Sequence, residues 1–128
     1  MAEICRQCNA TVTNAVGRLA DLTDKVTEAG VNILALCAWG EGDAGHIMLV
    51  ADDPEKACEA ITPAVDKCDW DEVICVKVAN RPGALNEISR RLADAGININ
   101  LVYASTIDAP EATIVMSTSD NAKAAELI

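Results

Sequence analysis

Two stretches of the chain carry apolar residues three or four positions apart, the spacing of a helix with one buried face. This spacing predicts a helix of about three turns over residues 19–29 and another over residues 85–95. Gly30 and Gly96 follow directly and are expected to end these helices. The apolar positions are Leu19, Leu22, Val26 and Ala29 in the first stretch, and Leu85, Ile88, Leu92 and Ala95 in the second.

After each helix the pattern changes to a period of two, which is typical of a strand with one buried face. The alternating positions are Val31, Ile33, Ala35 and Cys37, and then Ile97, Ile99, Leu101 and Tyr103. A turn-rich stretch, residues 40–45, separates the first of these strands from residues 46–50, so the two are expected to pair as an antiparallel hairpin. Residues 113–116 are the equivalent strand of the second half.

Asp53, Pro54 and Glu55 have the features of a helix start: an N-cap, a proline in the first turn and an acidic residue facing the helix dipole. They predict a second helix reaching Ile61, and Asp120 opens its counterpart. Residues 11–14 and 75–80 are read as the first strands of the two halves, and residues 65–70 as a last strand of the first half.

The two halves are also similar to each other in sequence. At an offset of 66, residues 13–19 align with 79–85, and residues 29–33 align with 95–99. After a one-residue slip, residues 53–61 align with 120–128. A match that keeps its register this long predicts an internal repeat.

The predicted fold is therefore α+β, with two ferredoxin-like βαββαβ units side by side, antiparallel sheets and helices on one face. The units are expected at residues 1–70 and 71–128. The second copy stops at Ile128, before a last strand. Its sheet then has three strands, or residues 1–8 or a partner chain supply a fourth. An edge left open in this way favours a homodimer.

Composition narrows the choice of partner. Twenty acidic residues against ten basic ones give a net charge of −10, which disfavours nucleic acid and anionic membranes. We find no export signal in residues 1–10 and no apolar run long enough for a membrane span, and we expect a soluble cytoplasmic protein.

Six cysteines lie in the chain, and Cys5 and Cys8 form one CxxC motif. In a reducing cytoplasm all six thiols are expected to be free. On a strand, side chains three residues apart point to opposite faces, so Cys5 and Cys8 are not expected to share a metal. A metal or redox module is the weakest of the functional hypotheses.

The turn over residues 80–85, Asn-Arg-Pro-Gly-Ala-Leu, joins the first strand of the second copy to its first helix. A glycine turn at a helix start leaves backbone N–H groups unpaired, and the helix dipole adds positive potential there. Such a turn can hold a carboxylate. It can also be no more than a strand-to-helix connection, as most such loops are.

The pattern Asn-x-Pro-Gly-x-Leu, a helix and then Ala-Gly-Ile-Asn-Ile resembles the ACT domain, the amino-acid-sensing module of many biosynthetic enzymes. The resemblance covers residues 8–70 and 71–128 and is looser in the first copy, where Val16 replaces the proline. It implies that the chain binds a small amino acid and regulates a separate metabolic enzyme or regulator.

The resemblance also implies the ligand contacts. In the serine-binding member of the family they come from an asparagine before the Pro-Gly turn and another at the start of the second strand, across a domain interface. An asparagine amide offers both a donor and an acceptor to a zwitterion. Val78 and Val12 stand where that member has a ligand-binding histidine. The expected ligand-binding residues are Asn80, Arg81, Pro82, Gly83, Ala84, Leu85 and Asn98, with Asn14, Gly17 and Asn32 in the first copy.

Catalysis is not expected. The single histidine, His46, has no nucleophile or base suggested beside it, and no cofactor-binding or phosphate-binding glycine loop is present. The alternative to sensing is an assembly module without ligand, in which exposed strand edges pair with a partner protein.

Overall fold

The computed structural model describes residues 2–128; Met1, the first residue of the expected first unit, lies outside the described residues. The elements, in chain order, are β1 (Ala2–Thr13), α1 (Arg18–Glu28), β2 (Ile33–Glu41), β3 (Ala44–Ala51), α2 (Pro54–Ile61), a 3₁₀ helix η1 (Thr62–Ala64), β4 (Lys67–Ala79), α3 (Ala84–Asp94), β5 (Ile99–Ser105), β6 (Glu111–Thr118) and α4 (Asn121–Leu127). The four helices and the two hairpins predicted from the sequence are confirmed. Among residues 2–128, no helix is long and apolar enough to cross a bilayer.

The architecture is α+β, with one antiparallel six-stranded sheet in the order β2-β3-β1-β4-β6-β5. The prediction of two separate sheets was wrong in this respect. Residues 65–70 and 75–80, read as two strands, belong largely to the single strand β4. The physical reason is that residues 67–79 contain no glycine or proline, so nothing in this stretch breaks the extended backbone.

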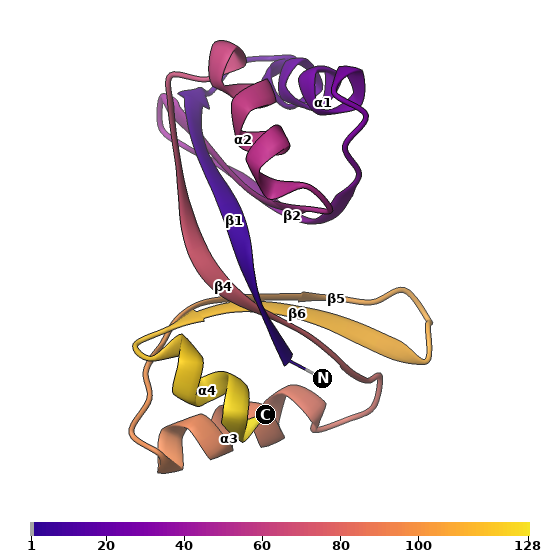
Figure 1. Ribbon diagram of the computed structural model, residues 1–128, viewed down its shortest axis with the longest axis vertical. Helices are drawn as coiled ribbons and strands as arrows, with labels where there is room; N and C mark the ends of the chain where they lie inside the picture. The colour runs from indigo at the N-terminus through magenta and orange to yellow at the C-terminus, as the bar shows by residue number, and fades with distance from the viewer. Residues whose placement is uncertain (1) are drawn as a thin grey trace. The chain divides into compact units, whose positions relative to one another are not determined.

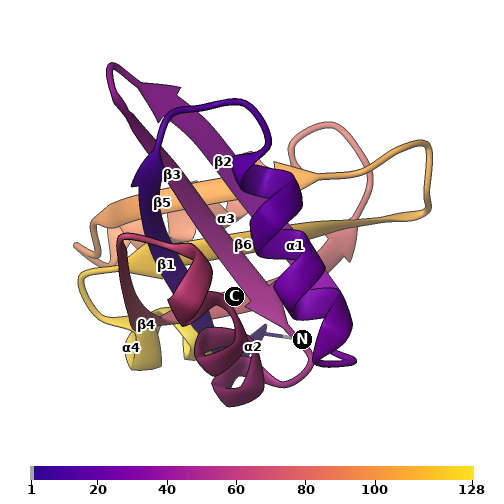
Figure 2. The same cartoon turned by 90° about the horizontal axis from the view of Figure 1, so that it is seen from above.

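The chain divides into two compact units, which we describe separately. The N-terminal unit comprises residues 6–71, and the C-terminal unit comprises residues 2–5 and 72–128. In the N-terminal unit α1 and α2 lie against one face of β1, β2 and β3 (Figures 1 and 2). In the C-terminal unit α3 and α4 cover one face of β5 and β6 (Figure 1), and residues 2–5 of β1 supply a further strand.

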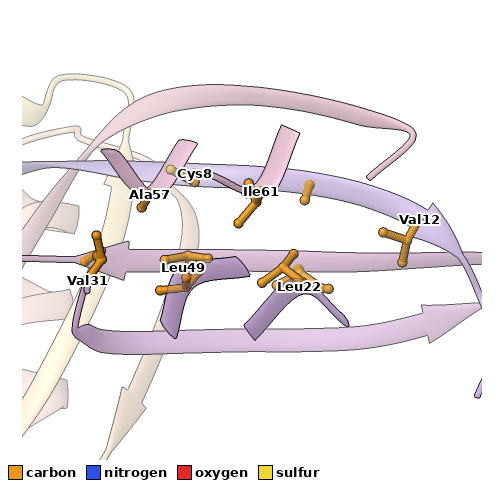
Figure 3. Packing of buried hydrophobic residues seen from close by; sticks show 11 residues of the cluster. Cys8, Val12, Leu22, Val31, Leu49, Ala57 and Ile61 are labelled. Atoms are coloured by element: carbon orange, nitrogen blue, oxygen red, sulfur yellow. The ribbon is translucent and has the colours of Figure 1, made fainter. Parts of the chain in front are cut away.

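The core of the N-terminal unit is aliphatic and lies between the sheet and its two helices (Figure 3). Leu22 and Val26 of α1 pack there with Leu49 of β3 and Ile61 of α2. The first residue of the predicted apolar stripe behaves differently, because the Leu19 side chain is 44% exposed.

The C-terminal unit repeats this arrangement. Ile88 and Leu92 of α3 are buried with Ile74 of β4 and Met116 of β6, whereas Leu85 is 40% exposed. Leu19 and Leu85 are therefore exposed residues in the first turns of α1 and α3, and they do not belong to the core.

Local geometry matches at equivalent positions of the two units. Gly30 and Gly96 follow α1 and α3 with φ of 71° and 72°. Asp53 and Asp120 cap α2 and α4 by accepting hydrogen bonds from backbone N–H groups three residues later, at 3.2 and 3.0 Å. These aligned glycines and helix caps thus have similar backbone conformations in both units.

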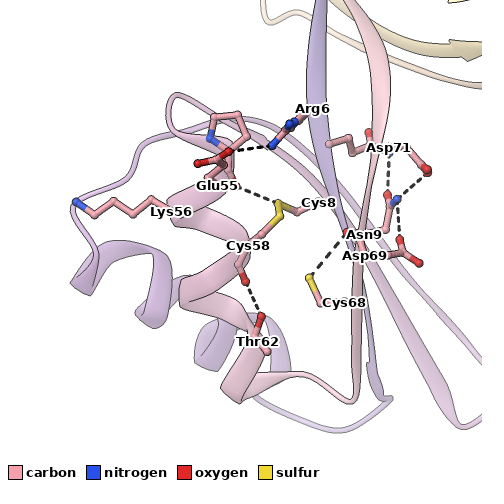
Figure 4. The surroundings of a disulfide bond; sticks show 12 residues. Arg6, Cys8, Asn9, Glu55, Lys56, Cys58, Thr62, Cys68, Asp69 and Asp71 are labelled. Atoms are coloured by element: carbon pink, nitrogen blue, oxygen red, sulfur yellow. Dashed lines mark hydrogen bonds and ion pairs between the residues drawn. A yellow bond between two sulfur atoms is a disulfide. The ribbon is translucent and has the colours of Figure 1, made fainter.

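The prediction that all six thiols are free was wrong, because Cys8 and Cys58 form a disulfide (Figure 4). Cys8 lies on the buried face of β1, and the packing of α2 on that face brings the two Cα atoms within 5.9 Å. Cys5, Cys37, Cys68 and Cys75 are free.

Candidate functional site

The turn between β4 and α3 leaves backbone N–H groups without acceptors among the described residues, at the start of a helix. Gly83 has a φ of +89°, which residues with a Cβ rarely adopt, and it begins α3 without a side-chain cap. The backbone N–H groups of Leu85 and Asn86 have no acceptor within residues 2–128. The positive end of the helix dipole lies at the same place. The unpaired N–H groups expected at this turn are therefore present.

Asn80 is held firmly at the start of this turn. Its side-chain amide donates a hydrogen bond of 2.8 Å to the carbonyl of Ala109, and its backbone N–H donates to Pro110 at 2.9 Å. Its Oδ1 accepts no hydrogen bond from the described part of the chain. One half of the amide is thus used by the fold, and the other half can accept from an ammonium group.

Arg81, a predicted ligand residue, has an internal partner. Its Nη2 donates to both carboxylate oxygens of Glu87 at 2.9 and 2.8 Å, and Nη1 donates to the carbonyl of Pro82 at 3.3 Å. The hydrogen bonds between the two side chains, and the attraction of their opposite charges, lower the pKa of Glu87 and raise the pKa of Arg81. The charge of Arg81 is therefore balanced before any ligand arrives.

Asn98 lies directly before β5. Its backbone N–H donates to Ser119 Oγ at 3.0 Å, and its side-chain amide donates to Asn100 at 2.7 Å. Its exposed side chain is otherwise available.

Asn80 and Asn98 lie at opposite ends of β6. Asn80 bonds to Pro110, just before this strand, whereas the carbonyl of Asn98 accepts from Ser119, just after it. Since β6 has eight residues, and a strand rises roughly 3.4 Å per residue, about 30 Å separate the two positions. The C-terminal unit does not bring its two predicted ligand asparagines together.

The first copy shows the same layout. Asn14 donates from its side chain to the carbonyl of Gly42 at 3.1 Å and from its backbone to Asp43 at 2.8 Å. Gly17 has a φ of +89° at the start of α1, as Gly83 has at α3. Asn32 lies near the far end of β3, where its backbone exchanges hydrogen bonds with Asp52.

Each unit has an open hollow beside its turn. In the N-terminal unit it measures about 210 Å³ and includes Asn14, Arg18, Trp39 and His46. In the C-terminal unit it measures about 240 Å³. Of the residues predicted from the sequence, this second hollow includes only Arg81 and Ala84, and its other charged residues are Lys77, Glu87 and Arg91.

Sequence reasoning missed these lining residues for different reasons. Arg91 follows Glu87 by one helical turn, a spacing that could have placed it on the same face. Trp39 and His46 flank the predicted hairpin turn at residues 40–45, a signal that could have paired them. For Lys77 and Arg18 the sequence carries no comparable signal.

The CxxC motif is divided between the two units. Cys8 is in the disulfide, whereas Cys5 lies beside Cys75. Burial, a hydrogen bond with the Cys5 thiol and nearby negative charge raise the pKa of Cys75 to about 12. Within residues 2–128, no group of three or more His, Cys, Asp or Glu side chains is placed to hold a metal ion.

Residues 73–127 match the ACT domain. This segment includes the turn at Gly83, its free N–H groups and Asn98. The match covers the C-terminal copy and leaves the N-terminal copy outside it. None of the curated proteins matches the chain.

Solved structures resemble the whole chain. A protein from Bacteroides thetaiotaomicron is 26% identical with a TM-score of 0.89, covering 98% of this chain and 87% of its own. The regulatory subunit of aspartate kinase from Thermus thermophilus, in a ligand-free form, is 13% identical with a TM-score of 0.75, covering 98% and 93%. A structure of aspartokinase alpha and beta subunits is 17% identical with a TM-score of 0.72 and the same coverage. The last two likenesses show the fold.

Proposed function

We propose that this chain is a regulatory protein without catalytic activity, which binds a small amino acid and passes the signal to a separate metabolic enzyme or regulator. The observation that carries the proposal is the turn at Gly83, whose free N–H groups lie within the segment that matches the ACT domain. The likeness to an aspartate kinase regulatory subunit supports a regulatory role. In this proposal the N-terminal copy is a second, more divergent ACT-like unit.

The proposed ligand lies with its carboxylate on the N–H groups of Leu85 and Asn86. The free Oδ1 of Asn80 accepts from the ligand ammonium. Asn98 of the same unit is about 30 Å away along β6, far beyond the span of a small amino acid. The Asn98 contact is therefore proposed to come from a second copy of the chain, in a homodimer.

An assembly module without ligand is the second candidate, and the edge strands favour it. β2 and β5 stand at the two ends of the strand order, and β5 carries no charged residue. Leu34 on β2 is 59% exposed and Val102 on β5 is 40% exposed. An edge strand that carries no charge and exposes apolar side chains, as β5 does, is prone to pairing with another strand.

A thermal-shift screen across the amino acids at millimolar concentration, followed by calorimetry, tests the proposal. With fewer than ten heavy atoms, the ligand is expected to bind with a Kd of roughly micromolar to millimolar. Asn80→Ala and Asn98→Ala should each weaken binding about ten- to a hundredfold, because each removes a hydrogen bond to a charged group. Ser89→Ala is the matched control, since its hydroxyl bonds only to Leu85 within the helix turn.

If no amino acid raises the melting temperature and light scattering still finds a dimer, the assembly module is the better account. If a ligand binds but neither asparagine substitution weakens it, the site is misplaced.

A further inference from the structure

We propose that the hollow of the N-terminal unit binds a small molecule that carries a carboxylate on a flat apolar body. The proposal deepens the proposed function, on which it rests, by giving the first copy a ligand class of its own. It depends on different residues, all of which lie outside the segment 73–127 that matches the ACT domain.

The hollow is formed where three parts of the N-terminal unit meet: the end of β1, the start of α1 and the β2–β3 hairpin. Its volume of about 210 Å³ is below the roughly 300–1,000 Å³ of pockets for drug-sized ligands, so its occupant is small. None of the lining residues is acidic, in a chain whose net charge is −10. The hollow therefore suits an anion.

Arg18 supplies the positive charge. It is half-buried, and it makes no ion pair and no side-chain hydrogen bond within residues 2–128. By contrast, Arg6 pairs with Glu55 at 3.2 Å and Arg81 pairs with Glu87 at 2.8 Å. A guanidinium presents a planar fork of donors that matches a carboxylate. The first-turn N–H groups of Leu19 and Ala20, also without acceptors in the described chain, point to the same ligand charge.

Trp39 supplies the flat apolar surface. Its side chain is 44% exposed and stacks on His46 with ring centroids 5.1 Å apart and planes inclined by 28°. The charged group that faces this pair is Glu41, whose Oε2 is 3.9 Å from His46 Nε2. An aromatic ring of the ligand can extend the stack, a favourable arrangement for aromatic groups.

The lining does not require an amino group on this ligand. Among residues 2–128, no carboxylate side chain lines the space. The Asn14 amide donates to the carbonyl of Gly42, which leaves its Oδ1 as a neutral acceptor. An aromatic carboxylate without an amino group therefore already satisfies the charged group that Arg18 supplies and the flat surface of Trp39.

Three probes test the proposal by calorimetry: benzoate, benzamide, which keeps the ring without the charge, and acetate, which keeps the charge without the ring. Benzoate is expected to bind with a Kd of roughly 0.1 to 10 mM, as its few atoms allow, and at least tenfold more tightly than either other probe. Arg18→Gln should weaken benzoate at least tenfold. Arg90→Gln, on the exposed surface of α3, removes the same charge and should leave the Kd unchanged.

The indole N–H signals of Trp39 and Trp70 in a ¹⁵N NMR titration give an independent readout. Benzoate should shift the Trp39 signal saturably and leave that of Trp70, which lies beside Arg6, in place. Equal binding of benzoate and benzamide, or Arg18→Gln binding as well as the wild type, would overturn the proposal, as would no binding at 20 mM. An amino-acid response that depends on Asn80 would survive that failure, so the two proposals fail separately.

Discussion

Asn80 donates a hydrogen bond of 2.8 Å from its side-chain amide to the carbonyl of Ala109. The bond joins the turn before α3 to the loop between β5 and β6. Asn14 makes the equivalent bond of 3.1 Å to the carbonyl of Gly42. An asparagine that the family resemblance presents as a ligand residue is therefore also a structural residue, in both copies.

Asn80→Ala should lower the free energy of unfolding by about 0.5–1.5 kcal/mol, the usual net value of one hydrogen bond. Urea denaturation measures this change. Asn98→Ala is the matched control and should cost less, because its side chain bonds only to the neighbouring exposed Asn100. An Asn80→Ala protein as stable as the wild type would show that the bond to Ala109 contributes nothing.

Gly83→Ala should destabilise the protein through the backbone alone. A Cβ at this position would meet no atom within 4 Å, so the cost comes from the φ of +89° and is roughly 1–2 kcal/mol. Gly83→Asn should cost less, since asparagine tolerates the left-handed region better than alanine does. Thermal and urea unfolding of the two variants measure this order. The opposite order would contradict the assigned conformation.

Breaking the Cys8–Cys58 disulfide should lower the free energy of unfolding by about 2–4 kcal/mol, because the bond closes a loop of 50 residues in the unfolded chain. Urea unfolding with and without a reductant measures the loss, and Cys5→Ala is a control that removes a thiol outside the bond. Titration of the denatured, unreduced protein should find four free thiols. Six would contradict the disulfide.

The Arg81–Glu87 pair should respond to acid. Because Arg81 lowers the pKa of Glu87, the pair stabilises the turn above the ordinary carboxyl value of 4.5, and the stabilisation is lost as the pH falls through the lowered pKa of the folded state. An NMR titration of the Glu87 carboxyl should give a midpoint below 4.5, rising toward that value in Arg81→Gln. Arg90→Gln should leave the midpoint in place. A Glu87 midpoint unaffected by Arg81→Gln would refute the pairing.

Local features of the fold could be predicted because they depend on short-range physics. The helices at 19–29 and 85–95 follow from apolar spacing, and the caps at Asp53 and Asp120 from backbone N–H groups that need an acceptor. That residues 67–79 form one continuous strand could also have been predicted, because they contain no glycine or proline.

Long-range contacts could not be predicted from one sequence. The Cys8–Cys58 bond depends on how α2 packs against β1. Arg81 in the turn pairs with Glu87 in α3. The two residues are six positions apart, which is not the three- or four-residue spacing that pairs side chains along a helix. Arg18 gave no signal, because its aligned position in the second copy is Ala84. It shares a hollow with Trp39 only because the start of α1 and the β2–β3 hairpin come together in the fold.

The measurement that tests the central proposal most directly is a ¹⁵N NMR titration with the amino acid that gives the largest thermal shift. The backbone N–H signals of Leu85 and Asn86 should shift saturably, because these groups receive the carboxylate, and the shifts should be lost in Asn80→Ala. Shifts confined to other parts of the chain, or none at any amino-acid concentration up to the millimolar range, would contradict it.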